Sequence, residues 1–188
     1  MKVLKLNKRN IKEGVKESVV LIKQGKVIIC PTDTVYGLLC DATNKKAVNK
    51  IRLIKKRPKS KPIPVFVRDI KMARTLVKID KEQEKFLMKV WPGKVTAVLE
   101  SKKGRGMIGI RIPKHKFVLD LIKKANRPLA ETSVNISGQL PVNSVKNMVK
   151  LFQNKKNRPD LILDAGVLIK AKSSKVIDLT RNFRVLRK

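Results

Sequence analysis

Residues 25–38 constrain the fold most, because an apolar strand is followed there by a dense group of hydroxyls. The run Val27-Ile28-Ile29-Cys30 is rich in β-branched residues and begins after Gly25, which predicts a buried strand. Pro31 has no N–H for a further ladder hydrogen bond, so the strand ends there. Three hydroxyls and a carboxylate follow, on Thr32, Asp33, Thr34 and Tyr36. Ligands bind at the carboxyl ends of strands in α/β sheets, which makes this turn a candidate site. The alternative is an ordinary turn in which Thr32 or Asp33 caps a helix and Tyr36 lies in the core.

The charge of the chain predicts anionic partners. It has 46 lysines and arginines against 14 acidic residues, a formal net charge of +32. Such a charge attracts polyanions, so phosphate-bearing partners are expected. The aromatic content of 4% is poor for stacking nucleic-acid bases. A lysine-rich surface on an ordinary enzyme and a dedicated nucleic-acid surface therefore both remain open.

Length and composition predict one soluble, cytoplasmic domain over residues 1–188. The hydrophobic share of 42% is enough for one core in a chain of 188 residues. Cys30 and Cys40 have neither CxxC spacing nor a histidine cluster, which argues against a zinc site or a disulfide framework. The sequence has no secretory h-region and no apolar run as long as a membrane span.

Hydrophobic periodicity predicts alternating strands and helices, and hence an α/β fold. Strands are expected at residues 2–6, 27–30, 63–67, 95–99, 107–112, 129–132, 161–165, 175–178 and 183–186. Helices are expected at residues 10–24, 44–57, 69–77, 80–90, 117–125 and 144–152. Asn10 with Glu13 and Asp80 with Gln83 are spaced as capping boxes, and Asn44 is a predicted N-cap.

A basic connection follows the second predicted helix. It reads Lys55-Lys56-Arg57-Pro58-Lys59-Ser60-Lys61-Pro62, with five cations and two prolines. Proline stiffens the backbone, so these cations could hold phosphates at little cost in entropy. A solvated basic loop is the alternative. Arg111 before Pro113 is a further fixed cation, while His115 has no partner nucleophile in a GxSxG elbow and is expected in a packing or surface role.

Hydroxyls recur at two later points of the chain. Residues 132–138, Thr-Ser-Val-Asn-Ile-Ser-Gly, follow a predicted strand, and Ser173-Ser174 precedes another. Neutral side chains and backbone N–H groups of this kind can bind a phosphate or a carboxylate. A capped turn into the helix at 144–152 is the alternative.

Gly104, Gly106 and Gly109 spell GxGxxG, the spacing of a dinucleotide fingerprint. That fingerprint works where it follows a strand and opens a helix. Here it follows a basic turn at 102–105 and runs into a predicted strand. We therefore reject it as a dinucleotide site, and no Walker A pattern is present either.

Taken together, seven motifs in this order resemble the threonylcarbamoyl-AMP synthase family of the YrdC/TsaC type, in the short form without an extra C-terminal domain. The motifs are Pro31-Thr32-Asp33-Thr34-Val35-Tyr36-Gly37-Leu38, Lys55-x-Arg57-Pro58 with Lys61-Pro62, Trp91-Pro92-Gly93-Lys94-Val95-Thr96, Arg111-Ile112-Pro113, Ser133-x-Asn135-x-Ser137-Gly138, Ser173-Ser174-x-Val176-Ile177-Asp178 and Leu186-Arg187. The resemblance implies a single YrdC-like domain, with a twisted mixed β-sheet flanked by helices and a concave basic cavity.

The resemblance also implies a reaction. L-threonine, bicarbonate and ATP, with Mg2+ carried on the ATP, would give threonylcarbamoyl-AMP and pyrophosphate. Such a nucleotidyltransferase performs the first step of the threonylcarbamoyl-adenosine modification of tRNA and hands its product to a threonylcarbamoyl transferase complex. Because two anions must approach each other, fixed positive charge and N–H donors suit the task.

Site residues follow from the same resemblance. Lys55 and Arg57 are the expected catalytic residues, with no metal ligand on the protein. ATP is expected to contact Lys55, Arg57, Lys61, Asn135, Asn143 and Arg187. Threonine is expected to contact Thr34, Arg111, Ser133 and Ser173, with Arg111 pairing with its carboxylate. We further expect Lys55, Arg57, Ser133 and Asn135 to line one pocket.

Two other functions remain open. One is a relative that makes carbamoyl-AMP on the same scaffold. The other is a module that binds tRNA or rRNA, which a charge of +32 would favour whatever the cavity does. Val134 and Phe66 depart from the family pattern, in which many relatives have Ala and several longer ones His.

Overall fold

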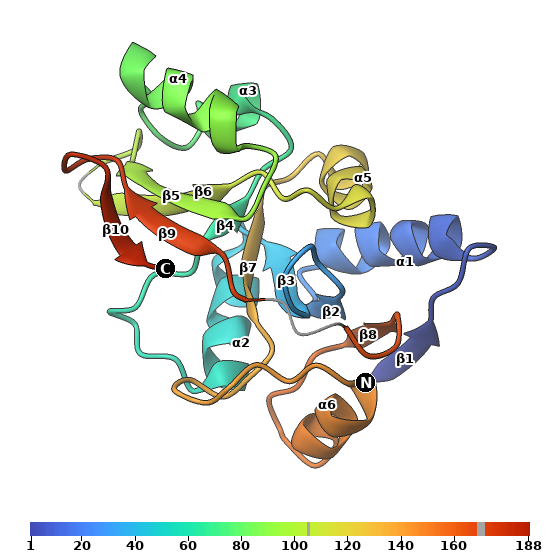
Figure 1. The fold of residues 1–188 in the computed structure, drawn as a ribbon. Helices are drawn as coiled ribbons and strands as arrows, with labels where there is room; N and C mark the ends of the chain where they lie inside the picture. Colours follow the sequence, from blue (N-terminus) through green and yellow to red (C-terminus); the bar gives the residue numbers. More distant parts are fainter. Residues whose placement is uncertain (105, 169–171) are drawn as a thin grey trace.

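One mixed β-sheet of ten strands forms the body of the protein (Figure 1). The structure is a computed structural model, and it describes residues 1–104, 106–168 and 172–188. Its strands are β1 (Lys2–Lys5), β2 (Ile28–Cys30), β3 (Gly37–Asp41), β4 (Val65–Phe66), β5 (Val95–Glu100), β6 (Met107–Arg111), β7 (Leu129–Ser133), β8 (Leu161–Asp164), β9 (Lys175–Asp178) and β10 (Arg184–Arg187). Its helices are α1 (Ile11–Lys23), α2 (Lys45–Lys55), α3 (Ile70–Ala73), α4 (Lys81–Val90), α5 (Lys116–Ala125) and α6 (Val145–Phe152).

The order of the strands differs strongly from their order in the chain. It runs β1-β8-β2-β3-β7-β4-β6-β5-β9-β10. Four neighbouring pairs are parallel, namely β1 with β8, β2 with β8, β4 with β6 and β5 with β9. The remaining pairs are antiparallel. The predicted α/β class, with a twisted mixed sheet flanked by helices, is confirmed.

Two hydrophobic clusters hold the helices against the sheet. Successive residues of β2 belong to different clusters, Ile28 and Cys30 to the first and Ile29 to the second, because side chains alternate along a strand. Helices α1, α3, α4 and α5 contribute to the first cluster, and α2 and α6 to the second. Figure 1 shows α3 and α4 beside β5 and β6 at the top, with α2 and α6 below the sheet.

Two of the three predicted helix caps are confirmed. The Asn44 side chain accepts a hydrogen bond from the Ala47 N–H, and Asp80 forms a complete capping box with Gln83. The capping box predicted at Asn10 is wrong. Although Asn10 occupies the N-cap position of α1, its amide binds the backbone of Asn7 and Lys5 instead. The preceding turn thus satisfies its side chain before the helix can use it.

Two predicted elements are shorter in the structure. The strand expected at 63–67 contains only Val65 and Phe66, since prolines 62 and 64 cannot donate to a ladder. The helix expected at 69–77 ends at Ala73. Beyond it the chain turns to follow β5, and Val77 bridges Ser101.

The strand at 27–30 leads into a hairpin and not into a helix. β2 pairs with β3 in antiparallel register, Cys30 opposite Gly37, so the alternative of a helix capped by Thr32 or Asp33 is wrong. Gly104 and Gly106 lie in the turn between β5 and β6, with positive φ angles of 139° and 127°, which confirms a turn there. Arg105 of the predicted basic turn is outside the described residues. Within those residues, no helix has the length and apolarity to cross a bilayer.

Candidate functional site

The register of the sheet brings Arg111, Glu131 and Ser133 to one face. Phe66 is opposite Arg111 on one side and opposite Leu129 on the other. Glu131 and Ser133 follow Leu129 at two and four residues, so they share the face of Arg111. A cavity opens there.

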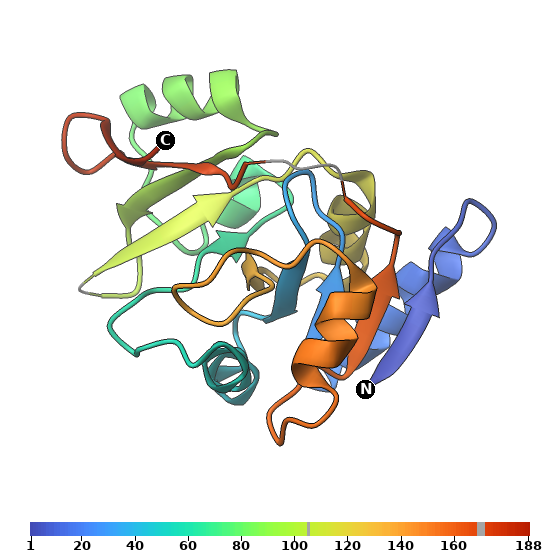
Figure 2. The same ribbon diagram turned by 60° about the horizontal axis from the view of Figure 1, so that its bottom comes forward.

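The cavity is lined by cations and hydroxyls from many parts of the chain. Arginines 57, 111 and 187 line it, together with the hydroxyl residues Thr34, Thr96, Thr132, Ser133, Ser173 and Ser174. Val35, Pro64 and a single carboxylate, that of Glu131, complete the described lining. Figure 2 shows how the loop that follows β7 returns beside the segment after α2, which brings separate motifs to one place.

Arg111 is fixed in the cavity wall by a buried ion pair. Its Nη2 donates to Asp33 Oδ1 at 2.7 Å and its Nε to the Gly93 carbonyl at 2.8 Å. The two charged side chains are only 2% and 8% exposed. The guanidinium also lies 5.4 Å from the centre of the Phe66 ring, a cation–π contact. Within the described residues, the other terminal nitrogen of Arg111 makes no hydrogen bond.

The three hydroxyls of the turn after β2 are all hydrogen-bonded within the protein. Thr32 Oγ1 donates to the Val35 carbonyl at 2.6 Å and accepts from the Thr34 N–H at 3.1 Å. Tyr36 donates to the Gly166 carbonyl and accepts from the Ala165 N–H. Burial raises its pKa to about 12, so the phenol stays neutral. Thr32 and Tyr36 therefore shape the turn, and Thr34, whose Oγ1 is hydrogen-bonded to Thr32 Oγ1 at 3.0 Å, lines the cavity.

Lys55 lies behind the cavity and holds the second hydroxyl loop. Its Nζ donates to the Ser133 carbonyl and to both the carbonyl and the Oδ1 of Asn135, the last at 2.7 Å. Ser133 Oγ also donates to Asn135 Oδ1 at 2.7 Å. Burial, followed by the nearby charge of Arg57, lowers the pKa of Lys55 to about 8. At neutral pH the ammonium therefore remains charged and clamps this loop.

The expectation that four residues line one pocket is half wrong. Arg57 and Ser133 line the cavity, whereas Lys55 and Asn135 are buried in the layer behind it. The reason is that the helical position of Lys55 places its stem in the core and its amine among backbone carbonyls.

The guanidinium groups of Arg57 and Arg187 are each held by hydrogen bonds to backbone carbonyls. Arg57 donates to the carbonyls of Lys61 and Pro62, and burial followed by Arg52 lowers its pKa from the usual value. Arg187 donates to the Ser174 carbonyl from Nε at 3.0 Å and from Nη2 at 2.8 Å. Ser174 in turn bonds Thr96. These contacts preorganise two cations on one side of the cavity.

Two further expected site residues are outside the cavity wall. Lys61 is exposed, and its carbonyl accepts hydrogen bonds from Arg52 of α2 and from Arg57. Asn143 is partly buried and its carbonyl accepts from the Leu168 N–H. Neither belongs to the described lining. Ser173, by contrast, lines the cavity as expected for a site residue.

Glu131 is the site residue that sequence reasoning missed. It lies in β7, where the pattern predicted only a strand. Burial raises its pKa to about 7, against the opposing charges of Arg111 and Lys55. The signal was an acidic residue between Ala130 and Thr132, which are both buried in this strand.

His115 is not part of the described cavity wall. Its Nδ1 is buried without a hydrogen-bond partner among the described residues. Burial lowers its pKa, while Asp33 acts in the opposite direction. The residue precedes α5, in keeping with the expected packing role.

A resident metal centre has little support in these residues. The described part of the chain contains no group of three histidine, cysteine, aspartate or glutamate side chains placed to hold a metal. One carboxylate and several cations line the cavity.

Comparison with known proteins places the chain in a family. A family model described as Telomere recombination, Sua5/YciO/YrdC, matches residues 20–188. The chain belongs to the Sua5/YciO/YrdC family. It is 32% identical to the threonylcarbamoyl-AMP synthase of Pyrococcus abyssi over 185 residues, with 91% of this chain and 54% of that protein covered. It therefore spans about half the length of that relative.

Other relatives support the same family. The putative threonylcarbamoyl-AMP synthase of Methanocaldococcus jannaschii is 32% identical, and 95% of this chain and 86% of that protein are covered. The solved structure of P. abyssi Sua5 complexed with L-threonine superposes with a TM-score of 0.88 at 29% identity, covering 97% of this chain and 55% of that chain. Escherichia coli YciO shares the fold, with a TM-score of 0.86 at 23% identity over 100% of this chain and 94% of that chain.

Proposed function

We propose that this protein is an L-threonylcarbamoyladenylate synthase. L-threonine, bicarbonate and ATP are its substrates, and threonylcarbamoyl-AMP and pyrophosphate are its products. The observation that carries the proposal is one cavity in which three fixed arginines face six hydroxyl residues, in a chain of the Sua5/YciO/YrdC family. The relatives named threonylcarbamoyl-AMP synthase support it.

Threonine would bind at the Arg111 end of the cavity. Arg111 is held by Asp33 and Gly93, which leaves part of its guanidinium to pair with a carboxylate. Thr34, Ser133 and Ser173 line the same cavity and would contact the amino acid. The structure of P. abyssi Sua5 with L-threonine supports an amino-acid site in this fold.

ATP would bind at the Arg57 and Arg187 end, with Mg2+ on its phosphates. Both guanidinium groups are anchored to backbone carbonyls, so they could face the phosphates without further ordering. We assign Lys55 and Asn135 the role of holding the loop that carries Ser133. ATP contacts by Lys61 and Asn143 remain predictions.

Catalysis in this proposal is positioning and charge neutralisation. The carbamate of threonine must attack the α-phosphorus of ATP, which brings two anions together. Fixed arginines reduce this repulsion, and they act most strongly where the cavity excludes water. No side-chain nucleophile is needed, and pyrophosphate is the leaving group.

Pyrophosphate release by the purified protein tests the proposal. With magnesium-ATP we expect release only when L-threonine and bicarbonate are both present, and we expect Arg57→Ala to abolish it. Lys59→Ala is the matched control, because it removes the same charge from the exposed part of the same connection. Pyrophosphate release that does not depend on threonine would contradict the proposal, and so would an equal loss of release in both variants.

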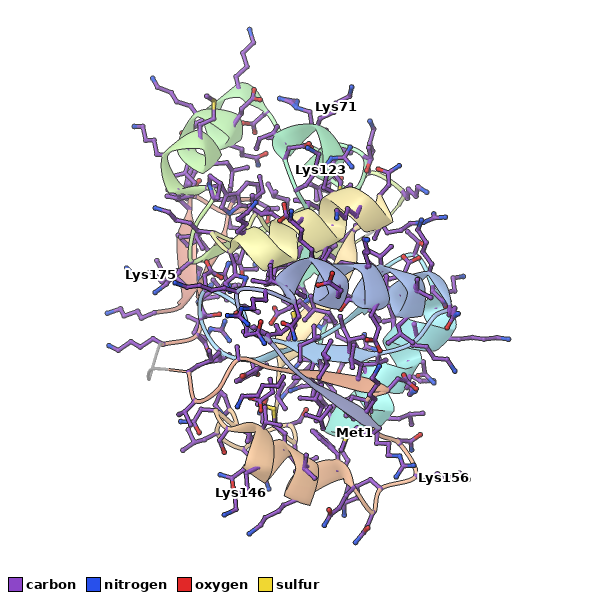
Figure 3. All side chains as sticks on the ribbon, turned by 90° about the vertical axis from the view of Figure 1, so that its right-hand side faces the viewer. Met1, Lys71, Lys123, Lys146, Lys156 and Lys175 are labelled. Atoms are coloured by element: carbon purple, nitrogen blue, oxygen red, sulfur yellow. The ribbon has the colours of Figure 1, made fainter. Side chains whose placement is uncertain are left out.

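RNA association is a second candidate function. Figure 3 shows lysines such as Lys71, Lys123, Lys146, Lys156 and Lys175 on many separate elements, and these five are exposed. We infer that this charge could keep the protein near tRNA and a transferase complex. Binding of tRNA should then weaken steeply with added salt, while pyrophosphate release should change little.

A further inference from the structure

The carboxylate of Glu131 has no counterpart elsewhere in the described cavity wall. The other charged residues there are arginines, so an acid among them is out of place in a site for phosphates. Its placement is built into the hairpin. A Cβ at Gly37 would lie 2.8 Å from Glu131 Oε1, so a larger residue there would displace the carboxylate from this position.

Glu131 also lacks a partner of its own. Within residues 1–104, 106–168 and 172–188, no hydrogen bond or ion pair uses its carboxylate. Asp33, the acid that pairs with Arg111, is by contrast occupied on both oxygens, by Arg111 and by the Lys114 N–H. Glu131 is therefore available to a ligand.

Four charged groups around Glu131 come from α2, β6, β10 and the turn after β2. Arg111, Lys55 and Arg187 favour its ionised form, whereas Asp33 opposes it. The neutral thiol of Cys30 is the other titratable neighbour, and both its burial and Glu131 raise the pKa of that thiol. Burial outweighs the three cations and raises the pKa of Glu131 to about 7. A group of this kind can exchange a proton at physiological pH.

A free amino acid carries both charges, and the cavity offers a partner for each. We propose that Glu131 binds the α-ammonium of the amino-acid substrate and takes its proton, an inference that rests on the proposed function. Arg111 and Glu131 share one face of the sheet, so the carboxylate and the ammonium of one small zwitterion can meet them together. This role explains an acid in a cavity otherwise suited to anions.

The proton transfer is required by the chemistry of the first bond. An ammonium has no lone pair, so its N–H bond must break, with the proton passing to a Glu131 oxygen. The freed lone pair then forms the N–C bond to bicarbonate. As the C–OH bond breaks, hydroxide leaves with a second amine proton as water, which gives the carbamate anion. Glu131 returns its proton to solvent after the product has left.

The substitution Glu131→Gln tests this role, with Glu100→Gln as the matched control. Glu100 is an exposed carboxylate that pairs with Lys78 at 2.9 Å, so the control removes the same charge far from the cavity wall. We expect Glu131→Gln to raise the KM for L-threonine about 10- to 100-fold, the range for a lost charged hydrogen bond. The KM for ATP should change less than about 3-fold, because ATP has no ammonium.

Two further readouts separate this role from a structural one. Calorimetry should show that the wild type prefers L-threonine over 3-hydroxybutyrate, which lacks the amine, and that Glu131→Gln loses this preference. The acid limb of kcat/KM for threonine, near pH 7 in the wild type, should disappear in Glu131→Gln and return in part in Glu131→Asp. A thermal melt verifies that each variant is folded.

The possible failures are distinct. If the wild type binds threonine and releases pyrophosphate while Glu131→Gln keeps its KM, its preference and its pH profile, Glu131 has no such role. If Glu131→Gln only raises the magnesium requirement, the carboxylate is a metal ligand and the inference is overturned. If the wild type neither binds threonine nor releases pyrophosphate, the proposed function falls, and this inference with it.

Discussion

Replacing Asp33 by asparagine should destabilise the protein through Arg111. The two side chains form the most buried ion pair of the described residues, 2% and 8% exposed, with a separation of 2.7 Å. Asp33 also accepts from the Lys114 N–H at 3.0 Å. Asparagine keeps one acceptor oxygen but leaves the buried guanidinium without its counter-charge.

The magnitude follows from the geometry. Removing one partner of a buried pair costs about 3–5 kcal/mol. The remaining acceptor oxygen and the nearby charge of Glu131 offset part of this, so we expect a loss of about 2–3 kcal/mol in the free energy of unfolding. For a chain of this size, that loss lowers Tm by about 4–12 °C.

Thermal melts of Asp33→Asn and Glu100→Gln at pH 7 measure the effect. The control breaks the exposed pair of Lys78 and Glu100, which should contribute at most about 1 kcal/mol. The KM for threonine should also rise in Asp33→Asn, because Arg111 loses its orientation. A Tm within 2 °C of the control's, about the shift of 0.5 kcal/mol, would refute the argument that Asp33 balances a buried charge.

Three other substitutions probe the site. Lys55→Met should cost about 2–4 kcal/mol of stability and slow pyrophosphate release at least about 10-fold, because the loop that carries Ser133 loses its clamp; urea unfolding and the release assay measure both, and an unchanged rate contradicts the role. Tyr36→Phe should cost about 1–2 kcal/mol in urea unfolding, because the Ala165 N–H and the Gly166 carbonyl lose their partner; an unchanged midpoint counts against it. Glu131→Gln should raise the free energy of unfolding by about 1–2 kcal/mol at pH 8 but not at pH 4. The folded-state pKa of Glu131 is raised from 4.5 to about 7, so the wild type loses stability as pH rises through this window; equal gains at both pH values would contradict the sign.

The sequence predicts local structure where a single interaction between residues close in the chain determines it. Asn44 caps α2 and Asp80 caps α4, because each side chain needs only a donor three residues ahead. Asn10 shows the limit of such patterns, since Asn7 and Lys5 compete for its amide. The apolar pattern likewise predicted a strand over residues 63–67, but beside prolines 62 and 64 only Val65 and Phe66 form one.

The sheet order could not be read from periodicity. β7 pairs with both β3 and β4, and β8 lies between β1 and β2, pairings that depend on contacts across the whole chain. The motifs gave the positions of the polar turns. They did not predict that β2 and β3 form a hairpin. This hairpin places Thr34 in the cavity wall.

Within the site, residue type predicted charge and not placement. Lys55 belongs to a basic run, yet its amine is buried among carbonyls of a loop 78 to 80 residues away. Arg111 finds its counter-charge at Asp33, also 78 residues away. Glu131 became a candidate only when the register put it beside Arg111, because an acid in a strand has no motif of its own.

The most direct test of the central claim is mass spectrometry of the product made from 13C-labelled bicarbonate. The protein would be incubated with magnesium-ATP, L-threonine and the label, and the nucleotides then separated. The account predicts an AMP adduct that contains threonine and one 13C atom, absent when any substrate is omitted and absent with Arg57→Ala. An AMP adduct without threonine, or no adduct from a folded protein, would contradict it.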